Sequence, residues 1–197
     1  TALIVVDMQN DFVHVGGALE LPDARARIGK VNEGIAACRA KAIPVIFTKF
    51  ISGPHKTLVW NWSPTIAPPA KCCWRNHKRF YPEKGRELEV TEIIEEIKVE
   101  PDDYIVEKYA YGAFYNTELE DILRALKREE VIICGCTMPI CVNDTVHGAF
   151  ERQFKVVLAP EACSSVDDPF RGFSLRLIAR KYGRVASNVE IIGELGC

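Results

Sequence analysis

Short apolar runs alternate with longer segments of helical periodicity along most of the chain. The first run, residues 2–6, is wholly apolar and ends at Asp7, a pattern typical of a strand buried on both faces of a parallel sheet. Comparable runs predict further strands at 43–48, 104–106, 131–134 and 155–159, with 189–192 as a candidate to close the sheet.

Segments with apolar residues at helical spacing separate these runs. Residues 24–41 carry Ile28, Val31, Ile35 and Cys38 along one face of such a segment. Similar patterns predict helices at 89–98, 117–127, 141–153 and 168–182. Because right-handed crossovers leave few other arrangements, we predict a three-layer α/β/α, Rossmann-like fold: a central parallel sheet of about six strands with helices on both faces.

One long segment, residues 50–86, interrupts the alternation. It holds five prolines and all three tryptophans, and a long irregular loop inside a compact domain is usually functional. We expect it to form a lid or an oligomer contact. Elsewhere the chain shows neither a repeat nor a linker, and 197 residues suffice for one full core, so we expect a single domain over 1–197.

Composition narrows the function. The 25 Lys and Arg residues against 27 Asp and Glu leave no basic excess, which disfavours nucleic acid as a partner. No apolar run approaches the ~18–20 residues of a membrane helix, and residues 1–7 lack the basic segment and cleavage site of a signal peptide. The eight cysteines lie mostly in apolar runs, which favours reduced, packed thiols. We therefore expect a cytoplasmic protein with neither nucleic acid nor a membrane as a partner.

Three candidate reactive residues lie at or beyond the carboxyl ends of predicted strands, where open parallel sheets bind ligands. Cys141 follows a glycine-containing turn and opens a helix, whose dipole is expected to lower the thiol pKa. Taken singly, each has another explanation: Cys141 as a packed cysteine, Asp7 as a cap, ion pair or metal ligand, and Lys108 as a solvated lysine. Together, Asp7 can accept the thiol proton while Lys108 holds Asp7 ionised.

Other residues offer weaker candidates. His14 is the rival base, which would make a Cys–His site. Cys72 and Cys73 with His77 could ligate a metal, but adjacent cysteines are not a usual zinc spacing, and packing or a disulfide is the alternative. Basic residues near the long loop could anchor a substrate carboxylate, although surface charge is the favoured interpretation: Lys49, Lys71, Arg75, Lys78 and Arg79.

Four motifs resemble those of the isochorismatase-like cysteine hydrolases. Residues 4–12 read IVVDMQNDF, 106–114 read VEKYAYGAF, 135–145 read GCTMPICVNDT and 156–162 read VVLAPEA. They resemble, in order, the family's opening motif, its lysine motif, its nucleophile motif and the strand that follows. The resemblance spans nearly the whole chain, and it is greatest for the N-carbamoylsarcosine amidase and ureidoacrylate amidohydrolase branch.

The resemblance implies a catalytic machinery. The triad would be Asp7, Lys108 and Cys141. A cis peptide would lie between Cys136 and Thr137, and the backbone N–H groups of Thr137 and Cys141 would form the oxyanion hole. The substrate pocket would be lined by Phe12, Trp60 and Tyr111.

Departures from the family pattern narrow the activity further. Nicotinamidases of this group bind a metal through an Asp-x-His motif after the second strand, but residues 48–55 read TKFISGPH, so we expect no such metal. The sequence shows no phosphate-binding loop, and we expect no organic cofactor. True isochorismatases lack the nucleophilic cysteine. The resemblance thus implies an amidohydrolase that cleaves a small amide, N-carbamoyl or ureido substrate through a thioester, as a homo-oligomer (dimer or tetramer). The alternatives are a nicotinamidase- or isochorismatase-type hydrolase and a non-catalytic binding protein on the same fold.

Overall fold

Six parallel strands form the central sheet of the computed structural model, which describes residues 1–63, 65–166 and 168–195. The strands follow the order β5-β2-β1-β6-β7-β8, and every neighbouring pair runs parallel. Their bounds are β1 Ala2–Val6, β2 Val45–Phe50, β5 Tyr104–Lys108, β6 Glu130–Gly135, β7 Lys155–Cys163 and β8 Arg184–Val185.

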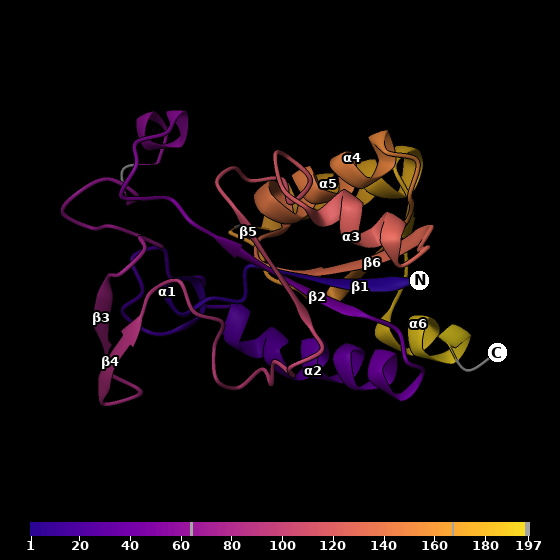
Figure 1. Cartoon of the computed structure of the whole chain (residues 1–197), viewed down its shortest axis with the longest axis horizontal. Helices are drawn as coiled ribbons and strands as arrows, with labels where there is room; N and C mark the ends of the chain where they lie inside the picture. The colour runs from indigo at the N-terminus through magenta and orange to yellow at the C-terminus, as the bar shows by residue number, and fades with distance from the viewer. Residues whose placement is uncertain (64, 167, 196–197) are drawn as a thin grey trace.

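Helices cover both faces of this sheet (Figure 1). On one face lie α2, Ala24–Ala40, and α6, Asn188–Leu195. On the other lie α3, Leu119–Ala125, α4, Asn143–Glu151, and α5, Asp168–Lys181. The short helix α1, Asn10–Val13, directly follows β1. The predicted three-layer α/β/α architecture is therefore confirmed.

The centre of the sheet is apolar because β1 contributes only apolar side chains, all of them buried. Leu3 of β1 pairs with Val45 of β2 on one side and with Ile132 of β6 on the other. A strand covered on both faces cannot tolerate polar side chains without partners. The first polar side chain along β1, that of Asp7, therefore appears where the strand ends.

The segment between β2 and β5 contains more structure than the sequence suggested. A single 3-10 turn spans Leu58–Asn61, and an antiparallel hairpin joins β3, Lys78–Tyr81, to β4, Arg86–Glu89. The hairpin stands at the edge of the molecule, beside α1 (Figure 1). Of the prolines counted in this segment, Pro64 lies outside the described residues.

The helix predicted at 89–98 is wrong. Past Glu89 the segment consists of turns and one isolated bridge between Ile93 and Gln9. It runs alongside the residues that follow β1: the N–H of Asn10 donates to the carbonyl of Glu92, and that of Ile94 donates to the carbonyl of Met8. Val90, Ile94 and Ile97 are all buried, and their spacing of four and three residues imitates a helical face. Tertiary contacts produced the pattern here.

The strand predicted at 189–192 is also wrong, because these residues lie within α6. A capping box begins this helix: the N–H of Ser187 donates to the Glu190 carboxylate at 2.7 Å, and the N–H of Glu190 donates to Ser187 Oγ at 3.3 Å. Val189 is exposed while Ile191 is buried, as a helix requires. The sixth strand is instead the two-residue β8.

Two further expectations bear on the chain as a whole. The seven cysteines that the structure describes are all buried and free, while Cys197 lies outside the described residues. No helix in the described part of the chain is both long enough and apolar enough to cross a membrane.

Candidate active site

A buried ion pair joins the ends of two strands. Asp7 follows β1 and Lys108 ends β5, with β2 between them in the sheet. Lys108 Nζ lies 2.6 Å from Asp7 Oδ2, and neither side chain is exposed. The ammonium group also donates to the carbonyl of Tyr111 at 2.8 Å and stands 4.9 Å from the centre of the Phe50 ring. Lys108 is therefore not the solvated lysine that its position alone allowed.

Thr48 of the intervening strand fixes the Asp7 carboxylate. Its hydroxyl donates to Asp7 Oδ1 at 2.6 Å and accepts the Asp7 N–H at 3.2 Å. Asp7 adopts a left-handed backbone conformation, φ 48°, which turns the chain at the end of β1. Sequence reasoning placed Thr48 at a strand end but gave it no role. The sequence feature that could have identified Thr48 is a hydroxyl group within an apolar run, on the strand next to the one that ends at Asp7.

Gly135 brings the cysteine turn against β1. It pairs with Val6 at a φ of 110°, and a Cβ at this position would lie 2.1 Å from the Val6 carbonyl oxygen. Only glycine fits such a close approach of two backbones. One residue further along, the peptide bond between Cys136 and Thr137 is cis, at the position that the family resemblance implied.

Cys141 lies in a single π-helical turn, Met138–Val142, that directly precedes α4. The hydroxyl of Thr145 donates to the carbonyl of Cys141 at 2.7 Å and accepts the N–H of Ala113 at 3.1 Å. Thr145 thereby joins the turn to the loop that follows Lys108. The predicted helix at 141–153 is correct in place, but its first turn is wider than an α-helix.

The Cys141 thiol contacts both members of the ion pair. Burial raises its pKa to about 12; Lys108 lowers the pKa and Asp7 raises it, and burial dominates. The expectation of a pKa lowered by the helix dipole is therefore wrong, because desolvation outweighs it. Burial also lowers the pKa of Lys108, but the attraction of Asp7 and Cys141 outweighs burial and the net direction is upward. The resting side chain is thus a thiol beside a carboxylate, and a base is needed to activate it.

A small cavity of about 50 Å³ opens beside Cys141. Thr137 and Cys136 of the cysteine turn form part of its wall. The N–H of Thr137 donates to no acceptor among the described residues, whereas the next N–H, that of Met138, donates to Ser164 at 2.8 Å. Apolar side chains form most of the remaining wall: Phe12, Leu19, Leu21, Phe50, Ile66 and Ile140.

Two of the three residues expected in the pocket lie in this wall. Phe12 stacks on Phe50 with ring centres 6.4 Å apart, and Phe50 contacts Tyr111 at 6.0 Å. Trp60 is not among the described residues that line the cavity, and a role for it in substrate binding stays a prediction. Its indole stacks on Trp74 at 5.1 Å and donates to the carbonyl of Ser52, which makes it a packing residue of the loop.

Other large apolar side chains of the loop face outward. Trp62 is 80% exposed and Leu58 is 73% exposed. Exposed apolar groups of this size often mark a contact surface. The expectation that the loop contributes to an oligomer stays a prediction.

His14 lies apart from the cysteine. Its Nδ1 pairs with Glu83 and its Nε2 lies 3.9 Å from Glu96, while its ring meets Tyr81 edge to face. It is not among the groups that act on the Cys141 thiol. The structure therefore does not assemble the alternative Cys–His site.

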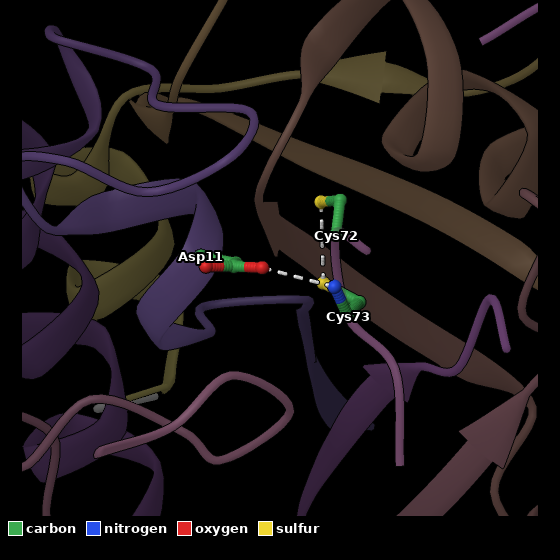
Figure 2. A group of neighbouring side chains, drawn as sticks. All are labelled: Asp11, Cys72 and Cys73. Atoms are coloured by element: carbon green, nitrogen blue, oxygen red, sulfur yellow. Dashed lines mark hydrogen bonds between the residues drawn. The ribbon is translucent and has the colours of Figure 1, made fainter. Parts of the chain in front are cut away.

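One group of potential metal ligands lies beside the cavity. Asp11, Cys72 and Cys73 place one ligand atom each within 4.8 Å of one another (Figure 2). The Asp11 carboxylate, however, already accepts bonds from Arg79 Nε at 2.7 Å and from the Tyr81 hydroxyl at 2.7 Å. A cation would have to displace the Arg79 guanidinium. The residues present fit an arginine-bound carboxylate better than a metal centre, and His77 is not part of the group.

The chain is similar to known proteins along most of its length. The sequence profile of the isochorismatase domain matches residues 1–190. The chain is similar to ureidoacrylate amidohydrolase RutB of Pseudomonas savastanoi pv. phaseolicola, with 30% identity over 95% of this chain and 80% of that protein.

Solved structures resemble the whole chain. A cysteine hydrolase from Pseudomonas syringae pv. phaseolicola superimposes with a TM-score of 0.88 at 26% identity, covering 99% of this chain and 92% of the other. N-carbamoylsarcosine amidase from Thermoplasma acidophilum superimposes with a TM-score of 0.74 at 28% identity, covering 95% of each chain.

Proposed function

The chain belongs to the isochorismatase family, and we propose that it is a cysteine-dependent amidohydrolase. It cleaves the C–N bond of a small amide, N-carbamoyl or ureido substrate through a thioester on Cys141. The names of its relatives, a ureidoacrylate amidohydrolase and an N-carbamoylsarcosine amidase, support this reaction class. The observation that carries the proposal is the buried contact of the Cys141 thiol with the Asp7–Lys108 pair.

The first half of the reaction forms the thioester. Because the Cys141 pKa is raised, the thiol loses its proton only as it attacks, and Asp7 is the base in contact with it. The sulfur adds to the substrate carbonyl, and the N–H groups of Thr137 and Cys141 hold the resulting oxyanion. Lys108 stabilises the negative charge of Asp7 before the transfer.

Departure of the nitrogen completes the thioester, and hydrolysis of the thioester then releases the acid. Protonated Asp7 donates its proton to the leaving nitrogen, so the C–N bond breaks and ammonia or an amine departs. Asp7 then accepts a proton from water, whose oxygen attacks the thioester. As the C–S bond breaks, Asp7 passes this proton to the departing sulfur and the free thiol is restored, so the net change is the addition of one water to one amide.

Trapping the thioester tests the proposal. A panel of small amides and ureido acids is incubated with the protein, ammonia release is measured, and acid-quenched samples are analysed by peptide mass spectrometry. We expect an acyl group on Cys141 for each substrate that is turned over. Cys141→Ala should lose at least about 10⁴-fold in kcat, as removal of a nucleophile does in other covalent enzymes.

Cys38→Ala is the matched control. Cys38 is also buried, but it packs in α2 against the core, away from the cavity. It should retain wild-type turnover. Turnover that survives in Cys141→Ala, or an acyl group on another cysteine, would overturn the assignment of the nucleophile.

A further inference from the structure

The wall of the cavity beside Cys141 carries no charged side chain among the residues that the structure describes. Its polar members are neutral: the hydroxyl groups of Ser63, Thr137 and Tyr111 and the thiols of three cysteines. A wall of this kind offers hydrogen bonds but no counter-ion.

The five basic residues that the sequence offered as anchors for a substrate carboxylate each contact another side chain of the protein. Lys49 Nζ lies 2.7 Å from Glu92, and Arg79 binds Asp11. Arg75 pairs with Glu107. Lys78 lies 3.9 Å from Glu89, and Lys71 stands 5.6 Å from the centre of the Trp74 ring. None of these five side chains lines the cavity.

The nearest cation, Lys108, is already neutralised. Its ammonium group lies 2.6 Å from Asp7, and its other bonds go to the carbonyls of Ala110 and Tyr111. With Cys141 protonated at rest, the reacting groups carry no net charge. A carboxylate that entered this cavity would lose its hydration without gaining an ionic partner.

The size of the cavity sets a second limit. At about 50 Å³ it is far below the roughly 300–1,000 Å³ of sites for drug-sized ligands. Aromatic rings from Phe12, Phe50 and Tyr111 bound one side of it. Such a space suits an acyl group of only a few carbon atoms.

We propose that this site selects an uncharged carboxamide with a short apolar acyl group over a ureido or amido acid that carries a carboxylate. The inference rests on the proposed amidohydrolase function and adds to it the substrate class. It separates this chain from the relative named for ureidoacrylate, whose name denotes an acid.

The first test compares two alkylating reagents that differ only in charge. Iodoacetamide and iodoacetate are allowed to react with the whole protein, and modification of Cys141 is followed by peptide mass spectrometry. The ratio of the two rates is divided by the same ratio for a free small thiol. We expect iodoacetamide to be favoured by at least about 10-fold after this correction, equivalent to about 1.4 kcal/mol in activation free energy. A corrected ratio at or below one overturns the inference.

A matched pair of variants extends this test. Leu19 is a half-buried wall residue, so a longer side chain there can reach both the cavity and solvent. Leu19→Lys introduces a cation, and Leu19→Met introduces a neutral chain of similar length. We expect the lysine variant alone to shift the corrected ratio toward iodoacetate. Equal ratios in the two variants would contradict the idea that charge in the wall decides selection.

Turnover separates this inference from the proposed function. Butyramide and succinamate differ by a methyl group in place of a carboxylate, and we expect a kcat/KM at least about 100-fold higher for butyramide. If succinamate or ureidoacrylate is the better substrate, the substrate class is wrong and the amidohydrolase function stands. If no amide is cleaved while the iodoacetamide preference holds, the function is wrong and the selection of uncharged ligands stands.

Discussion

Lys108 Nζ and Asp7 Oδ2 meet at 2.6 Å in a place that solvent does not reach. Two residues about one hundred positions apart therefore share one buried pair of charges, across the strand that lies between theirs. A pair of this kind adds little net stability, but removing one member leaves the other charge buried without a partner. Catalysis and folding thus depend on the same contact.

Single substitutions in this pair should be more damaging to stability than the double substitution. We expect Asp7→Asn and Lys108→Met each to lower the free energy of unfolding by about 3–5 kcal/mol. The double variant should lose less than the sum of the two, because it buries no unpaired charge. Urea unfolding of all four proteins gives the coupling energy. Additive losses would show that the two charges do not act as a pair.

Alkylation of Cys141 should respond to the pair in opposite directions. Asp7 raises the Cys141 pKa and Lys108 lowers it, around a value of about 12. Asp7→Asn should therefore lower that pKa and alkylate faster than the wild type at any fixed pH below it, whereas Lys108→Met should alkylate more slowly. The rate of iodoacetamide modification against pH measures the shift.

The Asp7→Asn variant should combine this faster alkylation with lost turnover, since an amide cannot return a proton to the leaving nitrogen. Circular dichroism confirms that the variants compared are folded. Slower alkylation in Asp7→Asn would show that proton removal by Asp7 outweighs the expected fall in the Cys141 pKa.

Thr48→Val should impair the chemical step more than substrate binding. Valine keeps the shape of threonine but removes the hydroxyl that donates to Asp7 at 2.6 Å. A hydrogen bond to a charged group is worth about 1.5–3 kcal/mol, so kcat should fall roughly 10- to 100-fold with little change in KM. Thr48→Ser keeps the hydroxyl and should restore most of the rate. Equal losses in the two variants would assign the effect to packing.

Gly135→Ala should destabilise the fold and reduce activity together. The added Cβ would meet the Val6 carbonyl oxygen at 2.1 Å, so β1 and the cysteine turn must separate. Gly34→Ala is the control, since its Cβ meets no atom within 4 Å in the middle of α2, and it should stabilise the protein by about 0.5–1 kcal/mol. Thermal unfolding distinguishes the two. A neutral effect at Gly135 would contradict the close approach.

The parallel sheet could be predicted because its strands are short and rich in apolar residues, and because helical segments separate most of them. The errors occurred where a local pattern had a tertiary cause. Val90, Ile94 and Ile97 are buried by the chain that follows β1, although their spacing suggests a helix. The start of α6 was visible in Ser187 and Glu190, a capping box that the apolar run after it concealed.

For the candidate site, too, some features could be predicted from the sequence and others could not. Asp7, Lys108 and Cys141 could be assembled from motifs, because strand ends converge at one edge of a parallel sheet. The direction of the Cys141 pKa shift could not be predicted, because it depends on how deeply the thiol is buried, which the sequence does not show. Nor could the position of Trp60, which depends on how the loop folds onto Trp74.

Asp11 has a consequence for how such proteins diversify. Its carboxylate accepts bonds from Arg79, Tyr81 and the N–H of Cys73, and so fastens the segment that supplies Ser63, Ile66 and Cys72 to the cavity. The reacting groups Asp7, Lys108 and Cys141 lie at or beyond strand ends and take no part in this attachment. A descendant could therefore exchange the whole segment for a foreign one, provided that it again offered an arginine and a hydroxyl to residue 11. New specificities can arise by such grafting while the inherited chemistry stays intact.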